Sequence, residues 1–128
     1  MFKARILIVE DAAFMRAQLK DMIESGGYEI IAQAANGTEA VHLFKQYRPD
    51  LVTMDITMPE MSGIAALEEI MKFDPLARVI MCSAVGQQNF VIASIQAGAK
   101  DFIVKPLQRD RILSAIAKAL QGLTEKVN

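Results

Sequence analysis

Cysteine is almost absent from this sequence, and the single one, Cys82, has no second thiol with which to form an intrachain disulfide. One thiol is also too few for a metal site built from several cysteines. Disulfides are not needed here, because hydrophobic residues make up 52% of the 128 residues and suffice for a core of ordinary size. We expect a single domain over residues 1–128.

The sequence also lacks an excess of charge of one sign and lacks long hydrophobic runs. Its formal net charge is −1, without the basic stripe of a nucleic-acid binder or the cluster that attaches a protein to anionic lipid. The first apolar run, residues 6–9, is too short for the core of a signal peptide, and no stretch reaches the length of a transmembrane helix. We therefore expect a cytoplasmic protein with neither a nucleic acid nor a membrane as partner.

Short apolar runs alternate with longer amphipathic segments along the chain. The runs are β-branched or bulky and mostly lack strict alternation, which is typical of strands buried on both faces of a parallel sheet. They lie at residues 5–9, 29–34, 51–54, 79–82 and 101–104.

The segments between these runs carry apolar residues at helical spacing, and each ends at a glycine or before a proline. The stop signals are Gly26, Pro49, Pro75, Gly98 and Gly122. Five repeats of strand and helix with short connections predict an α/β fold, in which helices cover both faces of a parallel sheet. Periodicity alone does not determine the order of the strands.

Ligands of open α/β sheets bind at the carboxyl ends of the strands, so the residues there are the candidates for chemistry. To this edge the first strand delivers Glu10 and Asp11, the third Asp55, the fourth Ser83 and the fifth Lys105. Each residue alone has an ordinary explanation, since acids cap helices and serine and lysine are common at surfaces.

Together these residues point to phosphoryl transfer. Three carboxylates at one edge repel one another and raise the pKa of some of them unless a cation is bound. Magnesium takes one or two carboxylates together with phosphate oxygens and water, whereas a lysine and a hydroxyl suit a phosphate better than a metal. We predict a site for Mg²⁺, with Mn²⁺ as a substitute, beside a carboxylate nucleophile.

Four segments match a known family in order and spacing: residues 6–11 (ILIVED), 55–63 (DITMPEMSG), 83–84 (SA) and 98–106 (GAKDFIVKP). Over the whole chain the sequence resembles the receiver domains of bacterial two-component signalling, and among these the single-domain response regulators of chemotaxis. The resemblance implies a flavodoxin-like fold with a five-stranded parallel sheet of order 2-1-3-4-5.

The resemblance also implies how the acidic residues act. Asp55 accepts the phosphoryl group. Asp11 and Asp55 bind the metal through their carboxylates, Thr57 binds it through its backbone carbonyl, and Glu10 acts through a metal-bound water. Glu10 stands where many members have aspartate, and this added methylene is a departure that could rearrange the contact.

The remaining roles concern the phosphoryl group and the switch. Ser83, Lys105 and the backbone N–H of Ala84 are expected to hold the phosphoryl oxygens, and the bond from Lys105 to Pro106 is expected to be cis. The switch is expected to involve Ser83 and an inward turn of Phe102, which stands where many chemotaxis members carry tyrosine.

The switching loop would span residues 84–88, with Gly86 lowering the barrier to its rearrangement. Val85 within it occupies a position that affects how fast the phosphoryl group is lost. The expected output face includes Ile95, Phe102 and Lys118.

The partners implied are a CheA-type histidine kinase as donor and a flagellar motor switch protein as target, with a dedicated phosphatase as a further candidate. The chain ends at Asn128 with no output domain, so we expect a signalling switch that acts through another protein and has no separate substrate. The alternative is a phosphorelay intermediate that passes the phosphoryl group to a second histidine protein.

Two other classes are disfavoured by particular residues. A magnesium phosphatase of the haloacid dehalogenase type expects a second acid where this chain has Thr57. A nucleotide-binding switch expects a glycine-rich phosphate loop, which the sequence lacks.

Overall fold

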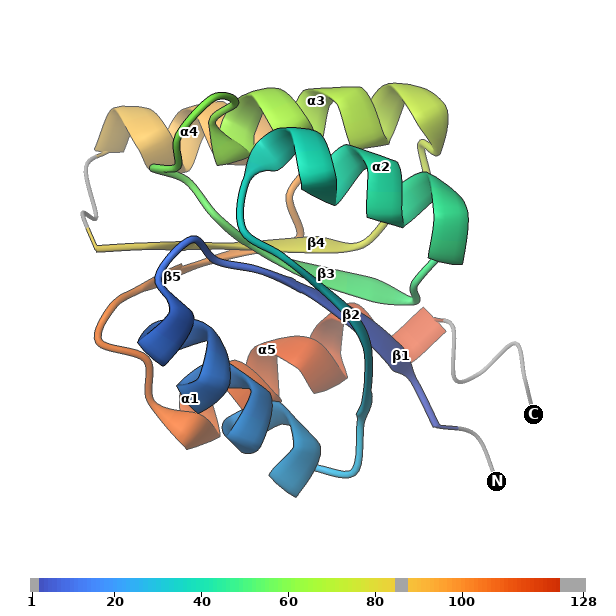
Figure 1. Cartoon of the computed structure of the whole chain (residues 1–128), viewed down its shortest axis with the longest axis vertical. Coiled ribbons are helices and arrows are strands. Elements are labelled where there is room, and N and C mark those ends of the chain that lie inside the picture. The colour runs from blue at the N-terminus through green and yellow to red at the C-terminus, as the bar shows by residue number, and fades with distance from the viewer. Residues whose placement is uncertain (1–2, 85–87, 123–128) are drawn as a thin grey trace.

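The structure, a computed structural model, describes residues 3–84 and 88–122 and alternates strands with helices throughout (Figure 1). The strands are β1 (Arg5–Val9), β2 (Glu29–Ala34), β3 (Leu51–Asp55), β4 (Val79–Ser83) and β5 (Asp101–Val104). The helices are α1 (Ala13–Ser25), α2 (Gly37–Tyr47), α3 (Gly63–Phe73), α4 (Gln88–Gln96) and α5 (Arg109–Ala119).

All strand pairs are parallel, and their order in the sheet is β2-β1-β3-β4-β5. The fold class and the strand order are thereby confirmed. Because the strands are parallel, their carboxyl ends share one edge of the sheet, which the register shows directly: Asp55 pairs with Cys82, and Ser83 with Val104.

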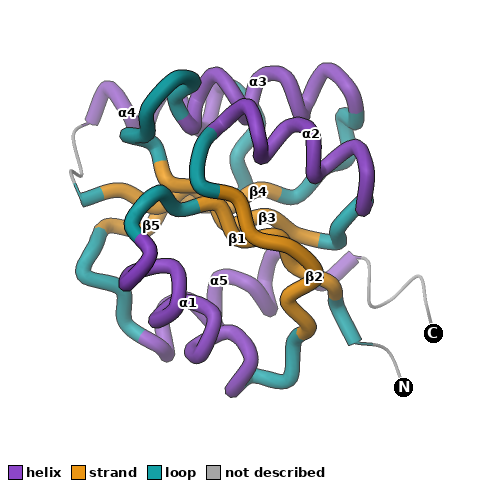
Figure 2. Tube along the Cα trace, in the orientation of Figure 1, coloured by secondary structure: helices purple, strands orange, loops and turns teal. Residues whose placement is uncertain are grey.

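The helices form a layer on each face of the sheet (Figure 2). Helices α2, α3 and α4 cover one face, and α1 and α5 cover the other. Successive residues of β1 serve both layers: Leu7 and Val9 belong to the core cluster under α2 and α3, while Ile6 and Ile8 belong to the cluster under α1 and α5. Burial on both faces explains why the central strands show no alternation of polarity in the sequence.

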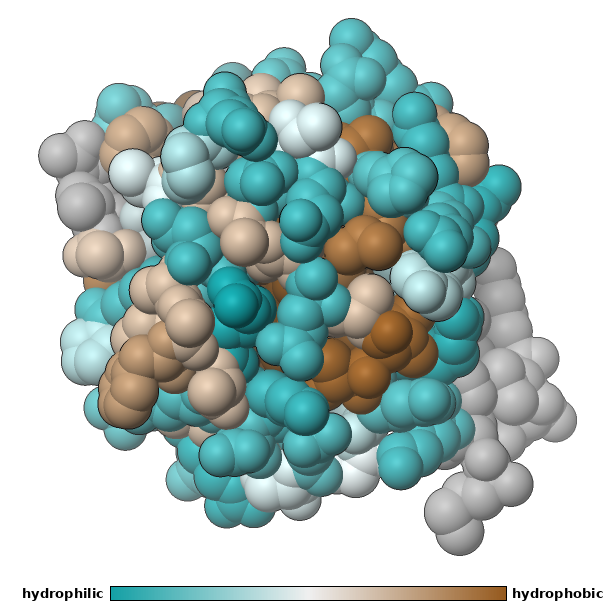
Figure 3. All heavy atoms as spheres, viewed as in Figure 1, coloured by the Kyte–Doolittle hydropathy of each residue, from teal (hydrophilic) through white to brown (hydrophobic). Residues whose placement is uncertain are grey.

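Strand β2 forms one edge of the sheet and is only partly buried. Apolar side chains come to the surface over this region in the space-filling view, on a face that is otherwise mostly hydrophilic (Figure 3). Within the described part of the chain, no helix is long and apolar enough to cross a membrane.

Some element ends differ from the sequence-based expectation. Strand β3 extends to Asp55 and β4 to Ser83, because each added residue pairs with the neighbouring strand. Helix α5 ends at Ala119 and not at Gly122, since Leu120 leaves helical geometry (φ −95°, ψ 0°) while its side chain is buried.

The connection from β3 to α3 folds back tightly against the end of β3. The Gly63 N–H donates to the carbonyl oxygen of Ile56 at 2.8 Å, and the Ser62 side chain caps α3 by accepting from the N–H of Ala65. A Cβ atom on Gly63 would lie 1.9 Å from the carbonyl oxygen of Asp55, so only glycine fits this approach. The packing holds the backbone of Asp55 in place.

Candidate functional site

The carboxyl edge of the sheet brings the predicted acidic residues together. Glu10 follows β1, Asp11 follows Glu10, and Asp55 is the last residue of β3. Each offers a carboxylate oxygen, and these oxygens all lie within 4.8 Å of one another. Asp11 is exposed, whereas Glu10 and Asp55 are 2% and 6% exposed.

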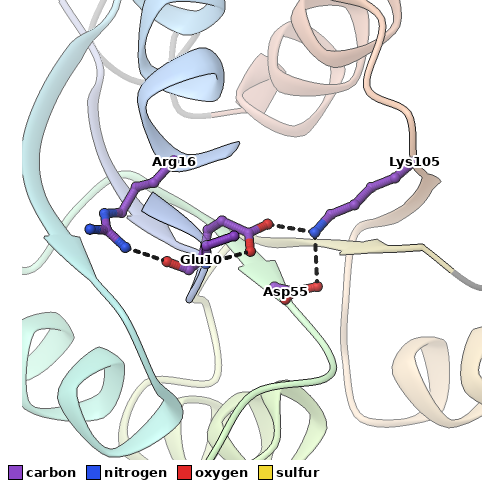
Figure 4. A network of polar contacts seen from close by, with 5 residues as sticks. Glu10, Arg16, Asp55 and Lys105 are labelled. Carbon is purple, nitrogen blue, oxygen red and sulfur yellow. Dashed lines mark hydrogen bonds and ion pairs between the residues drawn. The ribbon is translucent and has the colours of Figure 1, made fainter. Parts of the chain in front are cut away.

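Lys105 reaches into this cluster from the end of β5 (Figure 4). Its Nζ donates to Oε1 of Glu10 at 2.5 Å and to Oδ1 of Asp55 at 3.3 Å. The lysine side chain is mostly buried, with 14% of it exposed. One ammonium group is therefore shared between two carboxylates, and the contact with Glu10 is the shorter.

Glu10 is also held by two contacts from its own side of the sheet. Its Oε2 accepts a hydrogen bond from the N–H of Ala12 at 3.2 Å. Its backbone carbonyl accepts from Nη1 of Arg16 at 2.7 Å (Figure 4). Arg16 was not among the residues predicted from the sequence; its place in the first half of α1, the end that faces the site, is the signal that would have found it.

The electrostatics of the cluster follow from burial and from the charges around it. The pKa of Asp55 is raised to about 6, first by burial and next by the negative charge of Glu10, against the opposing effect of Lys105. Burial tends to lower the pKa of Lys105, but its hydrogen bond to Glu10 and the charges of Asp55 and Glu10 raise it on balance. The repulsion between carboxylates predicted from the sequence is present, although desolvation contributes more.

The donor set suits a hard divalent cation. Magnesium prefers carboxylate oxygens, and three such oxygens within 4.8 Å form a group of suitable size and charge. The positive charge of a bound cation would also offset the desolvation cost and the carboxylate repulsion that raise the pKa of Asp55.

The other predicted site residues lie at the same edge. Ser83 ends β4 and is 2% exposed, and its carbonyl oxygen accepts from the N–H of Lys105 at 2.7 Å. Thr57 and Ala84 are exposed residues just beyond β3 and β4. The peptide bond between Lys105 and Pro106 is cis.

The residues expected to form the output face lie on α4, β5 and α5. Ile95 is 51% exposed, which rules out simple core packing, and Phe102 is half-buried against the core under α2 and α3. Lys118 is exposed on α5 and lines a surface cleft of about 340 Å³ together with Arg78 and Lys100. Val85 and Gly86, expected in the switching loop, lie outside the described residues.

A parallel sheet of this order, with an acidic cluster and a lysine at its carboxyl edge, is the arrangement of a phospho-accepting receiver domain. Residues 6–117 match the family model for the response regulator receiver domain. The chain belongs to this family.

Within the family the most informative similarities are to chemotaxis proteins. The chain is 64% identical to the chemotaxis protein CheY of Bacillus subtilis (strain 168), over 91% of this chain and 97% of that protein. It is 61% identical to the chemotaxis protein CheY of Thermotoga maritima, over 89% of this chain and 95% of that protein. These relatives support a phosphorylatable response regulator of chemotaxis signalling.

A solved structure agrees with this similarity. The crystal structure of the CheX-CheY-BeF3-Mg²⁺ complex from Borrelia burgdorferi matches with a TM-score of 0.89 and 45% sequence identity, over 91% of this chain and 89% of that chain.

Proposed function

We propose that residues 1–128 act as a single receiver domain in which Asp55 takes a phosphoryl group from a histidine kinase in a Mg²⁺-dependent reaction. The observation that carries the proposal is the position of Asp55 inside the acidic cluster and 3.3 Å from the ammonium group of Lys105. A nucleophilic carboxylate, a cation site and a donor for phosphoryl oxygens are the parts that phosphoryl transfer requires.

The chemical step makes one bond and breaks one. An oxygen of the ionised Asp55 attacks the phosphorus of the donor phosphohistidine, the P–N bond breaks, and the imidazole nitrogen keeps the electron pair. A pKa of about 6 leaves Asp55 mostly ionised at neutral pH, as a nucleophile requires. Lys105, the Ser83 hydroxyl and the N–H of Ala84 donate to the phosphoryl oxygens.

Glu10, Asp11, Asp55 and the backbone carbonyl of Thr57 are the groups that we propose hold the cation, with Glu10 acting through a water. When bound, Mg²⁺ supplies positive charge that offsets the carboxylates and the phosphoryl oxygens. The similarity to a CheY structure that contains BeF3 and Mg²⁺ supports this part of the proposal.

The response to phosphorylation is a change in the affinity for a partner protein, and no separate substrate is converted. New charge at the sheet edge draws the Ser83 hydroxyl toward the phosphoryl group, and Phe102 turns inward behind it. The altered face includes Ile95, Phe102 and Lys118. A coupling of about 1–3 kcal/mol changes the affinity for a partner from severalfold to over a hundredfold.

The proposed donor is a CheA-type histidine kinase and the proposed target a flagellar motor switch protein, with a dedicated phosphatase as a third partner. Similarity to the CheY proteins of Bacillus subtilis and Thermotoga maritima favours this output over a phosphorelay. The cytoplasmic location expected from the sequence remains a prediction.

The deciding experiment is intact-protein mass spectrometry after incubation with acetyl phosphate, with and without Mg²⁺. We expect the mass of one phosphoryl group to be added only with Mg²⁺, and not in Asp55→Asn. The control Asp21→Asn changes an exposed aspartate on α1 and should be phosphorylated normally. No gain under any condition would refute phospho-acceptance, and a gain that persists in Asp55→Asn would refute the choice of residue.

The output is tested by mixing the phosphorylated chain with each kind of partner. Phosphorylation-dependent binding to a flagellar motor switch protein supports the chemotaxis output. Rapid transfer of the phosphoryl group from Asp55 to a histidine phosphotransfer protein, without binding to the motor switch protein, would instead establish the phosphorelay.

A further inference from the structure

Glu10 is a buried carboxylate held from three directions. Its Oε2 accepts from the N–H of Ala12, its carbonyl accepts from Arg16, and its Oε1 accepts from Lys105. The side chain is 3% exposed, so water contributes little to its solvation. The first two contacts hold its backbone and one oxygen, which leaves the other oxygen to face Lys105.

The shorter contact of Lys105 is with Glu10 and not with the proposed nucleophile. The Nζ-to-oxygen distance is 2.5 Å to Glu10 and 3.3 Å to Asp55. Charge-assisted hydrogen bonds of the shorter kind are the stronger ones. Lys105 is thus engaged chiefly by Glu10 before any phosphoryl group arrives.

The same carboxylate belongs to the cluster that suits a divalent cation. Because Glu10 would reach a bound cation through a water, the ammonium group of Lys105 competes with that water for the oxygens of Glu10, and its positive charge repels the cation. Occupation of the cluster by a cation therefore favours the release of Lys105 from Glu10.

The length of the glutamate side chain makes the contact with Lys105 possible. Aspartate at this position would withdraw the carboxylate by about 1.5 Å, one C–C bond, while the backbone hydrogen bonds of residue 10 with Ala34 and Arg16 keep its backbone near its present place. A 2.5 Å contact lengthened by that amount is no longer a hydrogen bond. The substitution therefore separates the pair without changing the charge of the site.

We propose that Glu10 is a positioning residue that exchanges partners: it holds the ammonium group of Lys105 in the metal-free protein and releases it when Mg²⁺ binds. Lys105 then becomes available to the phosphoryl group on Asp55. The inference rests on the proposed function of Asp55 and adds to it a built-in competition, in which the bond between Glu10 and Lys105 lowers the affinity for Mg²⁺.

The test is isothermal titration calorimetry with MgCl₂ on the whole chain, without any phosphoryl donor. Four proteins are compared: the unchanged chain, Glu10→Asp, Lys105→Met and the double variant. We expect Glu10→Asp to raise the Mg²⁺ association constant about three- to tenfold when Lys105 is present and less than about twofold when it is replaced by methionine. An equal gain in both backgrounds would show that aspartate simply suits the cation better, and would overturn the exchange. No gain in either background would overturn it as well.

A charge-matched control is Lys100→Met, because Lys100 is an exposed lysine at the opposite end of β5. In that background the gain from Glu10→Asp should remain whole, and its loss would assign the effect to net charge alone and refute the exchange. Circular dichroism checks that each variant is folded.

A second measurement avoids the methionine variants. The NMR signals of the Lys105 side chain should shift on addition of MgCl₂ in the unchanged chain and shift much less in Glu10→Asp, in which the lysine is already released. Equal shifts in the two proteins would contradict the exchange.

The exchange and the proposed function fail in different ways. If Mg²⁺ binds and Asp55 is phosphorylated, but the gain in Mg²⁺ affinity from Glu10→Asp does not depend on Lys105, only the exchange is overturned. Absence of Mg²⁺ binding from every variant overturns the magnesium step of the proposed function and the exchange with it.

Discussion

Asp55 is buried like a core residue but carries the ionisable carboxyl group that we propose as the nucleophile. It is 6% exposed at the end of β3, and desolvation is the largest cause that raises its pKa to about 6. An acid whose pKa is higher in the folded than in the unfolded protein binds its proton more tightly when folded. Ionisation of Asp55 therefore lowers the free energy of unfolding above pH 6. This loss of stability disappears as the pH falls toward 4.

The first prediction concerns this loss of stability, measured in metal-free buffer that contains a chelator. Asp55→Asn should raise the free energy of unfolding at pH 7.5 by about 1–2 kcal/mol, because it removes a buried charge while losing part of the contact with Lys105. The gain should shrink at pH 5, where Asp55 itself is protonated. Urea unfolding at both pH values measures it, and a gain that grows toward pH 5 would contradict the raised pKa.

The second prediction concerns Glu60, an exposed residue with a positive φ of 68°. A side chain with a Cβ atom is disfavoured there, so Glu60→Gly should stabilise the protein by about 0.5–1 kcal/mol in urea unfolding. Glu60→Ala keeps the Cβ atom and should give no such gain. Equal effects of the two substitutions would show that the backbone conformation is not the cause.

Arg48 offers an instructive contrast at φ 49°. Its guanidinium carbon lies 4.5 Å from the centroid of the Phe73 ring, which adds a cation–π contact. Glycine at this position would gain backbone freedom but lose that contact, so the sign of the effect of a positive φ depends on what the side chain touches.

At the scale of elements, the junction of β3 and α3 ties the fold to the site. The third prediction is that Gly63→Ala lowers the free energy of unfolding by about 3 kcal/mol or more. The new Cβ atom would meet the backbone of Asp55, which cannot move aside as the end of a flexible side chain can. Urea unfolding measures the loss. Gly122→Ala is the matched control, since among the described residues its Cβ atom would meet nothing nearer than 3.9 Å, and it should change the stability by less than about 0.5 kcal/mol.

Helix α4 is the least firmly packed of the described helices. Its one fully buried residue is the polar Ser94, whose Oγ has no hydrogen-bond partner among the described residues. Ile92 and Ile95 on the same helix are 46% and 51% exposed. A helix anchored by an unpaired hydroxyl gains less from burial than one anchored by leucine or isoleucine.

The fourth prediction is that Ser94→Ala slows amide hydrogen exchange in α4 about fivefold, since it removes a buried hydroxyl worth about 1 kcal/mol. Mass spectrometry of peptides covering α4 measures the rate. Thr53→Val is the control, because it removes the equivalent unpaired hydroxyl of β3 and should leave α4 unchanged relative to the rest of the chain. Faster exchange of α4 in Ser94→Ala would contradict the prediction.

At the scale of the whole molecule, two apolar clusters share one sheet. Residues of β1, β3 and β4 contribute to the clusters on both faces, so loss of either helix layer exposes the same strands. Such sharing favours cooperative unfolding, with the edge elements opening first.

The fifth prediction follows from that arrangement. Amides of β1, β3 and β4 should exchange only through global unfolding, and therefore last, while those of α4 and the edge strand β2 should exchange through local opening. Hydrogen exchange at increasing, sub-denaturing concentrations of denaturant distinguishes the two classes. Exchange of β3 at the rate of α4 would show that the sheet is not the stable centre of the molecule.

Most of the fold was predictable because its signals are local. Apolar runs and helical spacing located all the strands and helices of the described chain, since each depends on neighbours within a few residues. The ends of β3 and β4 at Asp55 and Ser83 were missed by one position, because pairing with a distant strand extended them. The strand order came from family resemblance, since periodicity carries no information about which strands are neighbours.

The sequence by itself determined the chemistry available at the sheet edge: the acids Glu10, Asp11 and Asp55 with Lys105, each at the end of a predicted strand. Only the tertiary structure decided that Lys105 lies nearer Glu10 than Asp55, that Arg16 holds the backbone of Glu10, and that the pKa of Asp55 is raised to about 6. Residue type and spacing are properties of the chain, whereas distance and burial depend on groups brought together from far apart, such as Glu10 and Lys105, separated by 95 positions. Parallel strands deliver such residues to a common edge, but packing alone sets the ångström differences that decide which of them pair.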